Sequence, residues 1–81
     1  MALFTLSYDL RKQRDYQPLY DELKTLNAVR VLESLWAIER VGINCIGIRD
    51  YFKQFVDKDD GLFVAEVTDW ATWRVIASPP N

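Results

Sequence analysis

The 81-residue sequence contains no histidine, one cysteine and three glycines. Without histidine, Ser-His and Cys-His nucleophilic catalysis are excluded, and general-base chemistry is left to carboxylates. The single cysteine, Cys45, cannot form a disulfide within the chain, which is compatible with a reducing cytosol. The sequence also contains no glycine-rich phosphate loop and no Cys/His spacing typical of a metal site.

Long apolar runs and an excess of basic charge are also absent. No apolar stretch approaches the roughly 20 residues needed to span a bilayer. The apolar N-terminal run has no basic flank and breaks at Asp9, so we expect a soluble, cytoplasmic protein without a signal peptide or membrane partner. The net charge is −2; residues 1–40 carry six basic and six acidic groups, and residues 41–81 carry four and six. This balance lacks the broad basic face of a tight nucleic-acid binder.

Apolar and aromatic residues are abundant instead, at 49% and 14% of the chain. A chain of this length predicts one domain, residues 1–81, with a small core. Because a small domain often buries excess apolar surface against a second copy of itself, we expect a homodimer.

The first half of the chain predicts a strand, a helix and a second strand. Residues 2–8 alternate as a strand does. After a polar loop, Asp15 is a plausible helix N-cap, Pro18 fits the first turn, and apolar residues recur at helical spacing until Asn27. Residues 29–39 return to strand character, and their length predicts a bulge or bend near Glu33-Ser34.

The second half predicts a helix over residues 43–55 and strands over residues 62–68 and 73–77. The order is β-α-β-β-α-β if the long second strand is split, and β-α-β-α-β-β if it is not. The number and size of the elements predict an α+β, ferredoxin-like sandwich with one mainly antiparallel sheet and two helices on one face. The open face then needs cover, for which a second protomer is the natural candidate.

Asp9 is the candidate catalytic and metal-binding residue. Ligand-binding residues often lie at the carboxyl ends of strands in α/β sheets. A carboxylate there suits Mg²⁺ or Mn²⁺, and two of them across a two-fold axis would suit a phosphodiester reaction. The alternative is that Asp9 caps the turn to Arg11 by an Asx hydrogen bond.

The basic residues that follow, Arg11, Lys12 and Arg14, could position a nucleic-acid backbone beside Asp9. The alternative is a solvated loop whose charges pair with Asp9 and Asp15.

Other conspicuous residues predict structure rather than chemistry. Residues 57–61 lack the ligand spacing of a calcium-binding loop and predict a turn. Trp36 is expected in the core or a dimer interface, and Cys45 as a small buried hydrophobe. Trp70 and Trp73 could pack over a sheet edge or stay partly exposed, and base stacking is the less favoured interpretation.

Two short motifs, Ser7-Tyr8-Asp9 and Glu33-Ser34-Leu35-Trp36, carry a resemblance that covers most of the chain. With the intervening helix, they resemble the SinR-like group of small bacterial proteins. That group is similar to the second CRISPR-associated protein of spacer acquisition and to virulence-associated protein D toxins. The resemblance implies a ferredoxin-like homodimer in which Asp9 matches the strand-end aspartate proposed for metal-dependent nucleic-acid cleavage.

The sequence departs from the CRISPR proteins in two respects. They usually have a C-terminal strand that joins the partner's sheet, for which residues 78–81 leave little room, and this chain is acidic. These departures argue against a role in spacer integration. From the resemblance we still expect a small dimeric metal-dependent nuclease, or a nuclease-derived binder of RNA or DNA. The alternative is a non-enzymatic interaction module, such as a toxin–antitoxin or defence-related adaptor.

Overall fold

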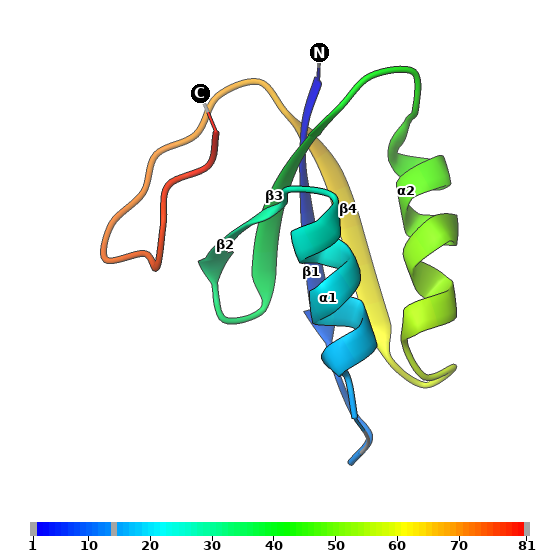
Figure 1. Ribbon diagram of the computed structural model, residues 1–81. Coiled ribbons are helices and arrows are strands. Elements are labelled where there is room, and N and C mark those ends of the chain that lie inside the picture. Colours follow the sequence, from blue (N-terminus) through cyan, green and yellow to red (C-terminus); the bar gives the residue numbers. More distant parts are fainter. Residues whose placement is uncertain (1, 14, 81) are drawn as a thin grey trace.

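A computed structural model describes residues 2–13 and 15–80 (Figure 1). The elements follow one another as β1 (Ala2–Asp9), α1 (Gln17–Thr25), β2 (Val29–Leu32), β3 (Leu35–Arg40), α2 (Cys45–Phe52) with a 3-10 turn η1 (Lys53–Phe55), and β4 (Gly61–Val67). The strands form one antiparallel sheet in the order β2-β3-β1-β4. This is the β-α-β-β-α-β arrangement of a ferredoxin-like α+β sandwich, so the predicted fold class is confirmed.

The predicted long second strand is two strands. The chain reverses at Glu33-Ser34, and β2 and β3 pair with a register shift between Arg30 and Leu32. The break was therefore placed correctly, but it is a complete hairpin turn rather than a bulge.

The first helix begins later than predicted. Tyr16, not Asp15, occupies the N-cap, while the Asp15 carboxylate still accepts a hydrogen bond from Gln17 N at 2.9 Å. Pro18 lies in the first turn, where its missing N–H costs nothing. After the helix, Asn27 takes a positive φ of 61°, a conformation that asparagine tolerates better than most residues.

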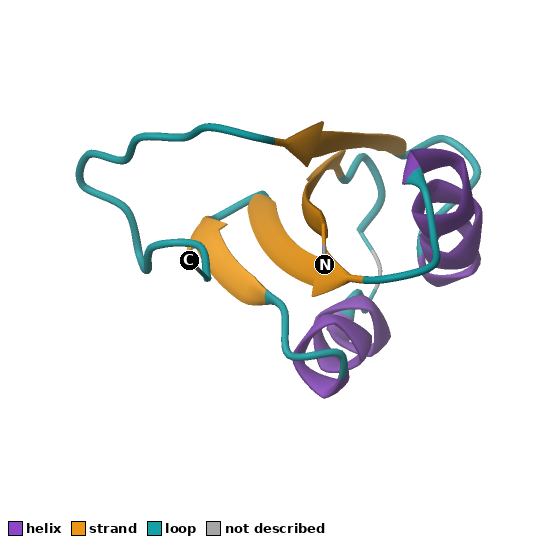
Figure 2. Cartoon of the chain, turned by 90° about the horizontal axis from the view of Figure 1, so that it is seen from above, coloured by secondary structure: helices purple, strands orange, loops and turns teal. Residues whose placement is uncertain are grey.

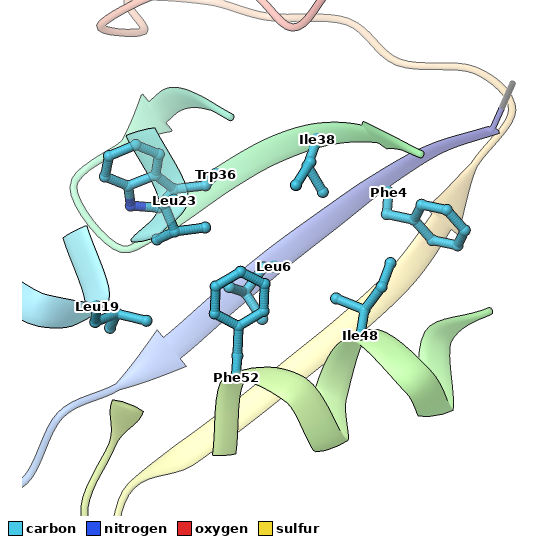
Figure 3. Close-up of a cluster of buried hydrophobic side chains, with 8 residues drawn as sticks. All are labelled: Phe4, Leu6, Leu19, Leu23, Trp36, Ile38, Ile48 and Phe52. Carbon is cyan, nitrogen blue, oxygen red and sulfur yellow. The ribbon is translucent and has the colours of Figure 1, made fainter. Parts of the chain in front are cut away.

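The main core lies between the sheet and both helices. Figure 3 shows side chains from two central strands meeting side chains from the two helices. Alternate residues of each strand point to this side, and the helices contribute residues at a spacing of four. The cluster consists of Phe4, Leu6, Leu19, Leu23, Trp36, Ile38, Ile48 and Phe52.

The opposite face of the sheet is partly covered by residues 68–80. Trp70 and Val75 pack against a second cluster formed by Leu3, Val31 and Ala37, and this segment runs on the side away from the helices (Figure 2). The strand predicted over residues 73–77 is wrong. Arg74 has a φ of 55°, which interrupts an extended run, and Ile76 N donates a single 2.8 Å hydrogen bond to Val31 O.

This cover reaches Val67 at the end of β4 but not the start of that strand. Phe63 belongs to the same face as Ser7, with which it pairs, and remains 65% exposed. The uncovered part of the sheet therefore lies over β1 and β4, toward the end of β1 that carries Asp9.

Candidate functional site at the end of the central strand

Asp9 is the last residue of the central strand β1, opposite Gly61 of β4. By strand alternation its side chain belongs to the face that the helices do not cover. That side chain is 71% exposed, and its Oδ2 lies 3.1 Å from Arg11 Nε. The predicted Asx hydrogen bond to Arg11 N is absent, because that N–H donates to Asp60 Oδ1 at 2.7 Å.

The two described basic residues of the loop are held by an acidic turn that lies far away in the sequence. Arg11 Nη1 donates to Asp59 O at 2.7 Å, and Lys12 Nζ lies 2.9 Å from Asp59 Oδ2. Lys12 thus pairs with Asp59 rather than with the predicted Asp9 or Asp15. Surface ion pairs of this kind contribute about 0–1 kcal/mol, so a phosphate could compete for either cation. Arg14, the third predicted phosphate ligand, lies outside the described residues.

Asp60 joins this turn to the loop and to the first helix. Its Oδ2 accepts hydrogen bonds from Tyr16 Oη at 2.6 Å and from Asp57 N at 2.7 Å, while its Oδ1 accepts the one from Arg11 N. Residues 57–60 form the predicted turn, closed by a 3.0 Å hydrogen bond from Asp60 N to Asp57 O, while Gly61 already begins β4. Gly61 leaves room there for Arg11, because a Cβ at this position would lie 3.2 Å from Arg11 Nη2.

A divalent cation would find one suitable ligand here. In the described part of the chain, no group of three or more metal-ligating side chains lies together. Mg²⁺ usually keeps several waters and is held by one or two carboxylates plus substrate phosphates. Asp9 therefore fits one half of such a site, and the other half needs a second copy of the chain or the substrate.

Two surface hollows flank Asp9. One, of about 240 Å³, is lined by Ser7, Gly61 and Phe63 together with Asp9. The other, of about 380 Å³, extends toward the β2–β3 turn and is lined by Tyr8, Tyr20 and Arg30 together with Asp9.

The second hollow is bordered by an ordered aromatic and cationic cluster. Tyr8 Oη donates to Glu33 O at 2.9 Å and accepts from Trp36 Nε1 at 3.1 Å. The Arg30 guanidinium lies 5.1 Å from the centre of the Tyr20 ring and 5.4 Å from that of Trp36. Burial is the main cause that raises the pKa of Tyr8 above its ordinary value of 10.0, so the phenol stays protonated near neutral pH.

Sequence reasoning missed this cluster. Residues 29–32 indicate only an apolar strand, and nothing distinguishes Arg30 until β2 is paired with β3. In that pairing Arg30 lies opposite Trp36. A cation facing a tryptophan across a hairpin was the available signal, but it requires the strand break to be placed first.

The other tryptophans and the cysteine have separate positions. Trp36 is 2% exposed and belongs to the core, as expected. Trp70 packs on the second cluster, whereas Trp73 is 79% exposed with the Arg74 guanidinium 4.6 Å from its ring centre. Cys45 is half-buried and packs against the core from the first turn of α2.

No protein-family model matches this chain, and no solved structure matches it at a significant level. Over the described residues, every helix is too short or too polar to cross a bilayer.

Proposed function

We propose that two copies of this chain act together as a metal-dependent nuclease, or as a nucleic-acid binder derived from one, with the paired Asp9 carboxylates holding Mg²⁺ or Mn²⁺. The position of Asp9 is the observation that carries the proposal. It ends the central strand, is 71% exposed and is engaged by a surface ion pair. Releasing that pair costs at most about 1 kcal/mol.

The chemistry divides between the cation and the chain. A divalent cation on Asp9 would polarise a phosphoryl oxygen and activate a water molecule. Arg11, no longer paired with Asp9, would turn toward a phosphate together with Lys12, which is already 47% exposed. The chain offers no histidine, so proton transfer would pass through carboxylates or water.

The proposal of a homodimer is supported by the uncovered sheet face. Asp9 and Phe63 share that face, and Phe63 exposes 65% of its surface. A two-fold axis near the end of β1 would bury Phe63 and bring the two Asp9 side chains toward each other. Exposed aromatic side chains are typical anchors of such interfaces.

The test is cleavage of labelled RNA, single-stranded DNA and duplex DNA with Mg²⁺ or Mn²⁺. We expect the wild type to cut at least one substrate and Asp9→Asn to lose that activity. Asp59→Asn is the matched control, because Asp59 is also an exposed aspartate paired with a cation of the same loop. Cutting that survives Asp9→Asn, or that is lost equally in both variants, would contradict the role of Asp9.

A second candidate is the non-enzymatic interaction module, such as a toxin–antitoxin or defence-related adaptor. It is favoured by the pairing of Arg11 and Lys12 with the acidic turn, which leaves the loop less available to nucleic acid. Trp73 and Ile76, 79% and 63% exposed, would then contribute to a protein contact. Absence of cleavage under every condition, with partner binding intact in Asp9→Asn, would favour this function.

A further inference from the structure

We propose that Arg30 is the residue that binds a phosphate of single-stranded nucleic acid in the hollow beside Asp9. The inference rests on the proposed function for the class of ligand, and it moves the principal phosphate contact away from the loop of Arg11 and Lys12. Those two cations already engage Asp9, Asp59 and the Asp59 carbonyl.

Arg30 is oriented before any ligand arrives. Its Nε and Nη2 donate to Glu33 O at 3.1 and 2.7 Å, and Nη2 also lies 3.5 Å from Tyr8 Oη. The guanidinium lies over the rings of Tyr20 and Trp36. These contacts fix the plane of the guanidinium, so less side-chain entropy is lost when a ligand binds.

The guanidinium keeps a donor for that ligand. Within the described residues, Nη1 makes no hydrogen bond, and Arg30 faces no carboxylate within ion-pair distance. Arg30 lines the same hollow of about 380 Å³ as Asp9. Arg30 lies on the helix-covered side of the sheet, over Tyr20 and Trp36, so it offers its donor to a phosphate at the end of β1 from the side opposite to the Asp9 carboxylate.

The hollow favours a flexible strand over a duplex. Arg30 is half-buried, and a flexible single strand can bring one phosphate to it by local bending, which costs a stiff duplex more. A single strand can place one phosphate there and leave its neighbouring base beside the Arg30 guanidinium, whose plane covers the Tyr20 ring and can itself stack on a base. The Asp9 charge opposes an anion, so neutralising it should favour binding.

The experiment measures binding of labelled single-stranded RNA, single-stranded DNA and duplex DNA to the Asp9→Asn protein over a series of salt concentrations. This background blocks the proposed cleavage and removes the opposing charge. Added Arg30→Gln should weaken single-strand binding by roughly ten- to a hundredfold, the range for a hydrogen bond to a charged group. It should also flatten the plot of log K against log salt by about 0.7, as expected for one lost phosphate contact.

Arg40→Gln is the matched control. Arg40 is also half-buried and donates to two backbone carbonyls, Leu26 O and Glu39 O, but it lies at the other end of β3. We expect it to leave the salt slope unchanged even where it lowers the melting temperature. Arg30→Lys retains the charge and should keep the slope while losing part of the affinity, which separates phosphate binding from a structural role in the hairpin.

The outcomes separate this inference from the proposed function. Lack of nucleic-acid binding, an unchanged slope in Arg30→Gln, or equal effects of Arg30→Gln and Arg40→Gln would overturn it. Equal Arg30 dependence for duplex and single strand would also overturn it. Cleavage that depends on Asp9 but not on Arg30 would keep the nuclease and reject the role of Arg30. Binding that depends on Arg30, without cleavage in any metal, would keep that role and reject the nuclease.

Discussion

Replacing Asp60 by asparagine should destabilise the protein far more than its position in a surface turn suggests. The carboxylate accepts hydrogen bonds from Arg11 N, Tyr16 Oη and Asp57 N, at 2.7, 2.6 and 2.7 Å. An asparagine has one acceptor oxygen in place of two, and its amide would face a donor N–H in either orientation.

The magnitude follows from those three bonds. At least one charge-assisted hydrogen bond is lost, and the others become weaker bonds to a neutral amide. A hydrogen bond to a charged group contributes about 1.5–3 kcal/mol to stability. We expect a loss of about 2–3 kcal/mol, a large part of the roughly 5–15 kcal/mol that stabilises a domain. The melting temperature should fall by roughly 8–24 °C, at about 4–8 °C per kcal/mol for a domain of this size.

The assay is urea unfolding followed by circular dichroism, with the m-value checked for constancy. Asp59→Asn is the control, because its carboxylate forms an ion pair with Lys12 and is 51% exposed. That variant should cost at most about 1 kcal/mol. If Asp60→Asn costs no more than Asp59→Asn, the hydrogen bonds of Asp60 do not hold the loop and the first helix in place.

Three further predictions concern the cluster, the core and the uncovered face. Tyr8→Phe should cost about 1–3 kcal/mol, because Trp36 Nε1 loses its acceptor. Burial raises the pKa of Tyr8, and the hydrogen bond to Glu22 raises that of Tyr51. The folded state thus holds these protons more tightly than the unfolded state; stability is fully present below about pH 10 and is lost as the pH rises further. Unfolding measured against pH should show a smaller alkaline loss in Tyr8→Phe, and an unchanged loss would contradict the assignment. Leu23→Ala should cost about 2–5 kcal/mol, because Leu23 is 0% exposed, whereas a loss below 1 kcal/mol would mean that α1 does not close the core. Phe63→Asp should yield a monomer by light scattering, while Ile46→Asp, at a 59% exposed position on α2, should not; a dimer that persists in Phe63→Asp would exclude the uncovered face as the interface.

Most of the fold could be predicted because its signals are local. The apolar periodicities of residues 2–8 and 16–26, the helix-start signal of Pro18 and the helix-end signal of Asn27 each act within a few residues. The hairpin at Glu33-Ser34 was harder, since it contains no Gly, Pro or Asn and strand character continues on both sides. Residues 73–77 misled for the opposite reason. They have strand composition, but Val75 packs on a sheet face instead of extending a ladder, and Trp73 and Ile76 remain 79% and 63% exposed.

The site was predictable only in part, because its decisive contacts join distant residues. Asp9 and Arg11 are neighbours in the sequence, so their pairing could be anticipated. The bond from Arg11 N to Asp60 spans 49 positions, and the one from Arg30 to Tyr8 spans 22. No spacing pattern encodes such contacts, and they exist only once the strand order is established.

The sheet order also explains why the candidate chemistry gathers at one end of the molecule. In the order β2-β3-β1-β4, the end of β1 lies between the β2–β3 turn and the start of β4. The turn brings Arg30 and Tyr8 together, and the start of β4 brings the acidic residues that hold Arg11 and Lys12. A ligand at the end of β1 would therefore have a pre-oriented arginine on one side. On the other side are two cations, Arg11 and Lys12, that already pair with carboxylates. The stronger phosphate contact is expected on the Arg30 side, since binding there breaks no existing ion pair.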